Sequence, residues 1–420
     1  MDMNKTDLQH LAAGVAFLGG GGGGTLRAGL EMIKENWKSD EPVKLVSVDE
    51  IRDDDKDLTV ACGFLAAQDA VEDATNFEDL RVVLEAFRKI AETEGLGRIA
   101  RLVPIELGVQ SCVLPICLTA KALNSSGNGW DLSVLDADGA GRAVPMISAT
   151  TLASASVDEK VKLFPAVFGG MIPDDPRTGV SGGRVWMRFE GQDSTGYHLH
   201  TSATGSLVGF VDSAAALVCW PMKSKSEVAS ALPPGVRGTL SLSRDLGRIF
   251  SEKSANPVQA GMDFLNSKGR NTFHIFQGTI KSVSKDQSRV KLINGKDSLI
   301  VLSSGENMAA IRAGKVRAMA PDSICYVTQD GTAFSSAEVN ELLKEKGKSI
   351  TVHVVGIPAR EEIRKSELAK VVFGVFRGNS LRHEKVRRDS ELPAVRAGVD
   401  VNEFSPIELL NASSSKAYAV

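Results

Sequence analysis

Hydrophobic patterns of helical and strand type alternate through the first third of the chain. Apolar residues recur at helical spacing over residues 8–18 and again from Leu26 to Ile33, while buried-strand patterns cover Leu58–Leu65 and Arg98–Val103. Helices of about 10 to 15 residues between such strands are typical of βαβ units, whose strands are parallel. The pattern therefore predicts an α/β fold that begins with a three-layer domain on a mostly parallel sheet.

The predicted elements become shorter and richer in strands from about Phe164 onward. Strand patterns recur over residues 272–327, and Asn294-Gly295-Lys296-Asp297 is typical of a tight turn between antiparallel strands. A chain of 420 residues is long enough for more than one domain. We expect an α/β domain over residues 1–165, a β-rich α+β domain of swivelling type over 166–350, and a tail over 351–420 that returns to the first domain.

Composition and charge exclude several classes of protein. The net charge of −3 and the absence of a basic stretch interleaved with aromatic residues argue against a nucleic-acid partner. No apolar stretch reaches the roughly 20 residues that cross a bilayer, so we expect no membrane partner. The 5 cysteines have no CxxC spacing, and the first residues do not resemble a secretory signal. These features predict a reducing compartment, the cytoplasm.

A run of glycines, Gly19–Gly24, lies between two helix patterns. A dinucleotide-binding fingerprint requires a strand before the glycines, and here a helix precedes them. Consecutive glycines let backbone N–H groups converge on a ligand near a helix start, whereas a flexible hinge is the alternative. Because the run loses much backbone entropy when it is ordered, we favour a binding role. A phosphate cradle is a further alternative, but no lysine of Walker type follows the run.

An acidic segment directly follows the strand pattern that ends at Leu135. Asp136 and Asp138 lie at the carboxyl edge of the predicted sheet, where ligands of open α/β sheets bind, and Arg142 follows them. The two carboxylates point to opposite sides if the strand continues, so one would meet a ligand or metal while the other anchors Arg142. A tight acidic turn with an Asp–Arg salt bridge explains the segment equally well. Glu106 ends another strand pattern and could share this edge.

Further polar residues follow strand patterns in the second half of the chain. Glu306-Asn307 and Asp322 stand at strand ends, where each could serve a site or a turn. His198 and His200 are two residues apart, so they share one face of a strand, as some zinc sites require. Exposed strand histidines are the more frequent explanation of that spacing.

The order of these segments resembles the S-methyl-thiohydantoin desulfurase family, formerly known as uncharacterised, hydantoinase-associated proteins. The most specific part of the likeness is Asp136 to Pro145, which matches the family's Asp-Ala-Asp-Gly-x-Gly-Arg-Ala-x-Pro. The glycine run, Pro104-Ile105-Glu106-Leu107-Gly108, Gly238 to Arg248 and Phe276 to Ile280 also follow the family pattern. The resemblance runs from about Leu11 to Val355.

The resemblance implies a hydrolase-like enzyme that acts on a small cyclic imide or thiohydantoin. Water would displace methanethiol from an S-methyl thiohydantoin and leave a hydantoin, and the family implies a zinc ion. An alternative is a non-catalytic subunit or ligand-binding partner of a hydantoinase- or oxoprolinase-type enzyme, and we expect a homo-oligomer. The site residues of this interpretation are Asp136, Asp138, Arg142 and Glu106 for catalysis, Gly20, Gly21, Gly22, Gly23, Thr25, Glu306 and Asn307 for substrate, and Asp322, His198 and His200 for metal.

Three departures from the family pattern fall at expected pocket edges. Val109-Gln110-Ser111 stands where the family has Gly-x-Asn, Gln68 lies where it has proline, and Ser304-Gly305 replaces Gln-Asn. They predict a divergent branch with another substrate or weakened catalysis.

Overall fold

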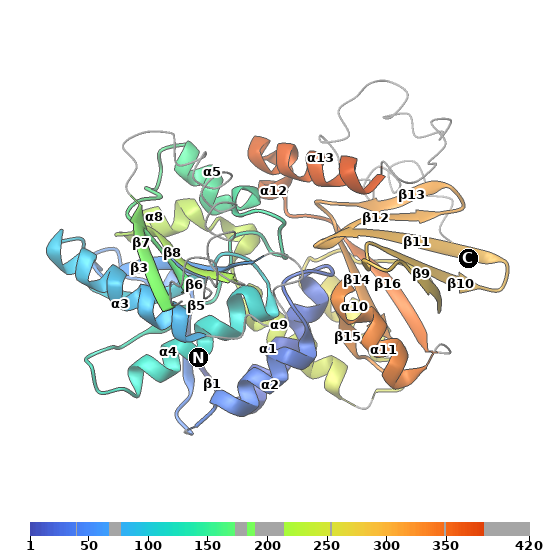
Figure 1. The fold of residues 1–420 in the computed structure, drawn as a ribbon, viewed down its shortest axis with the longest axis horizontal. Coiled ribbons are helices and arrows are strands. Elements are labelled where there is room, and N and C mark those ends of the chain that lie inside the picture. The colour runs from blue at the N-terminus through green and yellow to red at the C-terminus, as the bar shows by residue number, and fades with distance from the viewer. Residues whose placement is uncertain are drawn as a thin grey trace, which may run out of the picture.

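The computed structural model describes residues 1–38, 40–66, 77–172, 183–189, 214–252, 254–347 and 350–381. These residues form two domains, each built on an eight-stranded sheet (Figure 1). Gln68, His198 and His200 lie outside the described residues.

The first sheet is mixed, with a parallel half that matches the predicted βαβ units. Its order is β1-β2-β5-β4-β3-β8-β6-β7, and the pairs β2–β5, β5–β4 and β4–β3 are parallel. Helices α3 (Phe77–Thr93) and α4 (Leu114–Asn124) connect successive parallel strands. The strands are β1 (Asp2–Met3), β2 (Val43–Val46), β3 (Leu58–Ala66), β4 (Ile99–Pro104), β5 (Ser133–Leu135), β6 (Ala166–Ile172), β7 (Gly183–Phe189) and β8 (Ala214–Met222).

Strands β6, β7 and β8 differ from the sequence prediction, which placed them in the second domain. They extend the first sheet in antiparallel fashion, with β8 paired to both β3 and β6. Leu217 and Val218 are buried, because β8 lies inside the sheet between two neighbours. The local sequence pattern changes in the same way when a chain passes from parallel to antiparallel strands within one sheet and when it enters a new domain. The sequence pattern therefore did not distinguish these two cases.

The second sheet is antiparallel throughout, in the order β13-β12-β11-β10-β9-β16-β14-β15. Asn294 pairs with Asp297 across the predicted tight turn, where Gly295 has φ +57°. The strands are β9 (Phe273–Val283), β10 (Arg289–Asn294), β11 (Asp297–Ser304), β12 (Glu306–Arg312), β13 (Lys315–Met319), β14 (Ser323–Thr328), β15 (Ala333–Phe334) and β16 (Thr351–Ile357). Strand β16 therefore completes the second sheet, whereas the sequence prediction assigned it to a tail on the first domain.

Two helices cross so closely that glycine is required at the crossing. A Cβ on Gly14 of α1 (Lys5–Leu18) would lie 1.7 Å from the carbonyl oxygen of Ser243 in α9 (Thr239–Ser251), and one on Gly247 would lie 1.8 Å from that of His10. This contact fixes the end of α1, where the glycine run begins. The other helices are α2 (Leu26–Asn36), α5 (Thr151–Val157), α8 (Lys225–Ala231), α10 (Pro257–Ser267) and α11 (Val339–Lys346), with short turns η1 (Val48–Glu50), η2 (Val109–Val113), η3 (Ile147–Ala149), η5 (Pro234–Val236) and η6 (Ser336–Glu338).

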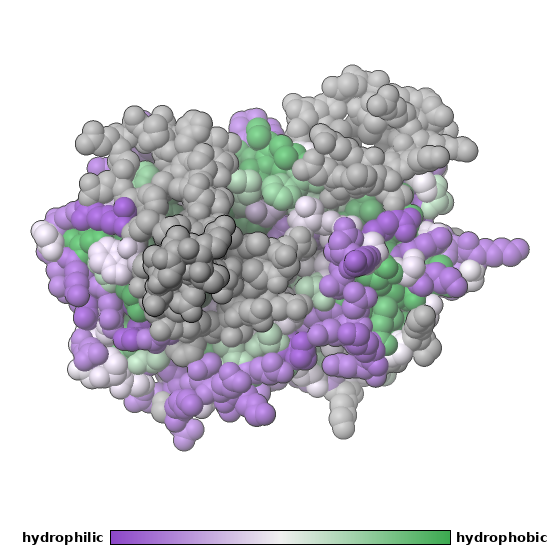
Figure 2. Space-filling model, viewed as in Figure 1, coloured by the Kyte–Doolittle hydropathy of each residue, from purple (hydrophilic) through white to green (hydrophobic). Residues whose placement is uncertain are grey.

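Helices α12 (Glu361–Lys365) and α13 (Glu367–Leu381) lie across the top of both domains in Figure 1. Phe373 of α13 is buried in a small apolar cluster with Val144 of the first domain and Met308 of the second. The outer side of α13 carries Val371 and Val375, each 56% exposed, and apolar surface is visible at the top of Figure 2. In the described part of the chain, no helix is long and apolar enough to cross a membrane.

Candidate functional site

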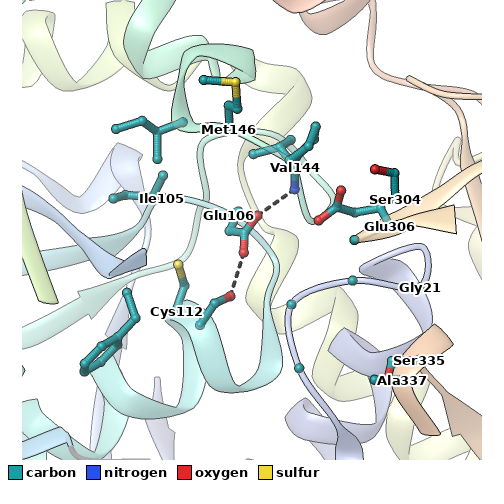
Figure 3. Close-up of a pocket in the computed structure, with 18 of the residues that line it drawn as sticks. Gly21, Ile105, Glu106, Cys112, Val144, Met146, Ser304, Glu306, Ser335 and Ala337 are labelled. Atoms are coloured by element: carbon teal, nitrogen blue, oxygen red, sulfur yellow. Dashed lines mark hydrogen bonds between the residues drawn. The ribbon is translucent and has the colours of Figure 1, made fainter. Parts of the chain in front are cut away.

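A cavity of about 390 Å³ lies between the two domains (Figure 3). The first domain contributes the glycine run, the residues after β4 and the segment before η3. The second domain contributes the β11–β12 turn and the start of η6, and Phe376 of α13 completes the wall. The site therefore exists only where the domains meet.

The glycine run is fixed by its carbonyl groups. Gly20, Gly21, Gly23 and Gly24 have positive φ angles, a conformation that glycine adopts without strain. The carbonyl oxygens of Gly19, Gly20, Gly21 and Gly23 accept hydrogen bonds from the backbone N–H groups of Ala143, Asn307, Ser336 and Gln110, at 2.9 to 3.3 Å. Gly21 to Gly24 line the cavity, and no described residue accepts a hydrogen bond from their backbone N–H groups. The run thus offers unpaired donors to a ligand.

The run is also tightly packed. A Cβ would lie 2.5 Å from Asn307 Nδ2 at Gly21, 2.5 Å from Glu306 Cγ at Gly22 and 2.3 Å from Gly108 Cα at Gly23. Thr25 ends the run as the N-cap of α2, and its hydroxyl oxygen accepts a hydrogen bond from the N–H of Ala28. Packing of this kind requires glycine for close approach.

Glu106 follows β4 and points into the cavity from the first domain (Figure 3). One carboxylate oxygen accepts a hydrogen bond from the Ser111 hydroxyl at 2.6 Å, and the other accepts one from the Val144 N–H at 2.6 Å. Burial raises the pKa of Glu106 to about 7, although these hydrogen bonds oppose the rise. A carboxyl group with such a pKa can exchange protons at neutral pH.

Glu306 begins β12 and reaches the same cavity from the second domain. It is 6% exposed, and its Oε2 has no hydrogen-bond partner among the described residues. Burial raises the pKa of Glu306 to about 8, and the nearby charge of Glu106 adds to the effect. A carboxyl group with such a pKa favours its protonated form at neutral pH and can donate a hydrogen bond or a proton.

Asp136 and Asp138 do not line the cavity. Asp136 accepts hydrogen bonds at 3.0 Å from the N–H groups of Leu240 and Ser241, at the start of α9. Asp138 is fully buried and accepts hydrogen bonds from the N–H groups of Ala140 and Gly141 at 2.8 and 2.6 Å. Burial raises the pKa of Asp138 to about 6. In the structure both carboxylates hold backbone in place.

Arg142 joins the two domains behind the cavity. Its guanidinium donates hydrogen bonds to the carbonyl oxygens of Ala143 at 2.8 Å and of Pro321 and Asp322 at 2.7 Å. Burial lowers the pKa of Arg142, whereas the nearby carboxyl of Glu306 opposes this effect. Its hydrogen bonds go to carbonyl oxygens, so the Asp–Arg bridge considered from the sequence does not describe this segment.

Asn307 lies behind the glycine run and outside the cavity lining. Its amide donates to the carbonyl oxygen of Ile324 at 2.7 Å and accepts hydrogen bonds from Ser303 and Ser336 at 2.8 Å. Because its backbone N–H also holds Gly20, Asn307 shapes the glycine run.

The described residues do not fit a zinc ion. Among them no group of three or more His, Cys, Asp or Glu side chains is placed to hold a metal. Asp322 is fully buried, and its carboxylate accepts a hydrogen bond from the Ala359 N–H at 2.9 Å. Since His198 and His200 lie outside the described residues, the zinc ion stays a prediction.

Several cavity residues were missed from the sequence. Ser111 and Ser304 stand at departures from the family pattern, a signal that placed them at pocket edges without assigning a role. Cys112 and Met146 gave no signal, because nothing in their local pattern distinguishes a cavity wall from ordinary core. Burial raises the pKa of the Cys112 thiol well above its ordinary value, so this cysteine is an apolar wall rather than a nucleophile.

The fold and the site together define a two-domain α/β protein with a cavity between its domains that is lined by two glutamates. Residues 6–170 match the S-Me-THD-like N-terminal domain, and residues 203–375 match the S-Me-THD-like C-terminal domain. The chain therefore belongs to the S-methyl-thiohydantoin desulfurase-like family, which confirms the resemblance seen in the sequence. The family name implies a role of the thiohydantoin desulfurase type.

A solved structure supports the fold. The crystal structure of a protein from Chromobacterium violaceum is 25% identical to this chain and superposes with a TM-score of 0.72. The match covers 89% of this chain and 96% of that chain. No curated protein matches the chain.

Proposed function

We propose that this protein hydrolyses the C–S bond of a small S-alkylated thiohydantoin or related cyclic imide in the cavity between its domains. The observation that carries the proposal is the pair Glu106 and Glu306, two buried carboxyl groups with raised pKa values that face one cavity from two domains. The family supplies the substrate class, and the free N–H groups of the glycine run fit the polar edge of such a ring.

The two carboxyl groups have complementary roles in the first half of the reaction. Ionised Glu106 takes a proton from water while the water oxygen forms a bond to the ring carbon that bears the sulfur. Protonated Glu306 gives its proton to the adjacent ring nitrogen, which would otherwise become anionic. The N–H groups of Gly21 to Gly24 stabilise the negative charge that develops at the ring edge.

The second half of the reaction restores both groups. The tetrahedral carbon expels the alkyl thiolate as its C–S bond breaks, and its hydroxyl proton returns to Glu306 as the ring carbonyl forms. Glu106 gives its proton to the thiolate, which leaves as a thiol. The products are the ring with a carbonyl group and one thiol, and both carboxyl groups regain their starting protonation states.

The test is the release of methanethiol from an S-methyl thiohydantoin by the purified protein. Glu306→Gln keeps the shape of the side chain and removes the proton, so we expect at least a 100-fold loss of kcat, in the range of general acid–base catalysis. Glu367→Gln is the matched control, because Glu367 lies on α13 with its side chain 84% exposed. Full activity of Glu306→Gln would contradict the proposal. Binding of the ring without turnover by the wild-type protein would favour the non-catalytic alternative.

A further inference from the structure

The walls of the cavity separate into a polar side and an apolar side. In Figure 3, Glu306 and Ser304 lie on one side, Ile105 and Met146 lie on the other, and Glu106 stands between them. The polar side holds the hydrogen-bonding groups that the proposed chemistry uses. The apolar side has no part in that chemistry. Its residues therefore indicate which chemical groups the bound molecule carries besides the reacting ring.

The apolar side is built from several elements of the first domain and from α13. Phe64 comes from β3, Ile105 follows β4, Ile147 begins η3 and Phe376 comes from α13. Phe64, Ile105 and Ile147 are between 1% and 7% exposed, so packing holds their positions. Side chains fixed in this way present a preformed apolar surface, which is the usual lining of a small-molecule site.

The cavity is larger than a five-membered ring requires. A volume of about 390 Å³ lies within the range of pockets that enclose drug-sized molecules. A bare ring held at Glu106 and Glu306 would leave the apolar side in contact with water, which is unfavourable. A substituent on the ring would fill that space.

The charge of the lining limits what this substituent can be. Among the described lining residues the ionisable side chains are Glu106, Glu306 and Cys112, and no lysine, arginine or histidine is present. A carboxylate on the apolar side would lose its hydration without meeting a cation, and Glu106 would repel it.

We infer that the ring bound in this cavity carries an uncharged apolar substituent, of the size of a leucine or phenylalanine side chain, which packs against Phe64, Ile105, Met146, Ile147 and Phe376. The position of the ring itself rests on the proposed function. The inference adds a selectivity that the family does not assign: rings with apolar side chains are preferred over bare rings, and rings with carboxylate side chains are rejected.

Calorimetric titration with three hydantoins, which contain the ring of the proposed product, tests this selectivity without turnover. The probes are hydantoin, 5-benzylhydantoin and hydantoin-5-acetate. We expect the benzyl compound to bind at least roughly tenfold more tightly than hydantoin, since even single methylene groups in apolar pockets reach such factors. We expect the acetate to bind more weakly than hydantoin. Equal affinities, or a preference for the acetate, would overturn the inference.

Met146 allows the preference to be reversed by design. Met146→Lys places a cation in the apolar side, so we expect it to bind the acetate at least roughly tenfold more tightly than the wild-type protein does and the benzyl compound more weakly. Met146→Leu, which conserves volume and polarity, should keep the wild-type ranking. An unchanged ranking in Met146→Lys would count against the inference. Selective binding without methanethiol release would leave the selectivity intact and refute the proposed reaction. Failure of all three rings to bind would overturn the inference, and the release assay would still decide the proposed reaction.

Discussion

Glu106 and Glu306 reach one cavity from different domains, and the charge of Glu106 helps to raise the pKa of Glu306. Neither residue has an acidic neighbour in the sequence that would suggest such a pair. Because the two carboxyl groups interact, the pKa values that a titration measures are properties of the pair. This relationship leads directly to a prediction about pH.

A plot of kcat/KM against pH should be a narrow bell-shaped curve. Glu106 must be ionised, so kcat/KM should rise with pH up to about pH 7. Glu306 must be protonated, so kcat/KM should fall above about pH 8. A pH series of methanethiol release measures both limbs. In Glu306→Gln the fall at alkaline pH should disappear from the residual activity. A flat profile between pH 5 and 9 would be inconsistent with the assigned roles.

Ser111 should tune the acidic limb of this profile. Its hydroxyl donates to Glu106 and lowers the pKa of that carboxyl against the effect of burial. Ser111→Ala should therefore raise the pKa of Glu106 and move the acidic limb to higher pH by about one pH unit, given the strength of a hydrogen bond to a charged group. Ser126→Ala, at the surface beyond α4, is the control and should leave the limb in place. An unmoved limb in Ser111→Ala would show that Glu106 is not the group that titrates there.

Gly21→Ala should destabilise the protein through a steric clash. Gly21 has φ +94°, and an added Cβ would lie 2.5 Å from Asn307 Nδ2. We expect the free energy of unfolding to fall by about 2–4 kcal/mol, from backbone strain and overpacking together. Gly127→Ala is a matched control, because Gly127 has φ +73° with no atom within 4 Å of an added Cβ. That control should lose only about 1 kcal/mol in urea denaturation, and equal losses would argue against close packing of the run.

Arg142→Lys should weaken the link between the domains. A lysine cannot reproduce the planar fork that reaches the carbonyl oxygens of Ala143, Pro321 and Asp322, so buried acceptors would lose their partners. We expect a loss of about 2–4 kcal/mol in the free energy of unfolding. Arg98→Lys is the control, since Arg98 pairs with Asp57 at the surface and should lose less than about 1 kcal/mol. If Arg142→Lys were as stable as the wild type but inactive, the catalytic role expected from the sequence would regain support.

The sequence was most informative where local pattern decides the structure. The parallel strands, the antiparallel second sheet and the turn at Gly295 follow from hydrophobic period and turn chemistry, and the structure confirms them. Pairing between distant strands was not predictable in the same way. Strand β8 joins β3 across more than a hundred residues, and its local pattern does not identify that partner.

The site shows the same limit at the level of single residues. Glu106, Glu306 and the glycine run could be selected because polar residues and glycines at strand and helix ends stand out in a sequence. Asp136 and Asp138 stood out equally, but the structure places their carboxylates on backbone N–H groups. Whether a carboxylate meets a ligand or a backbone depends on tertiary contacts, which the spacing of residues does not contain.

The cavity has a consequence for synthesis of the protein. Gly21 and Phe376 both belong to its wall, so the chain must be synthesised at least as far as α13 before the wall is complete. A product that stops before Glu306 would contain the glycine run without the strand that holds Gly20. A ligand that needs the complete wall can therefore stabilise only chains that include α13, and products that stop earlier would gain no protection against proteolysis from its presence.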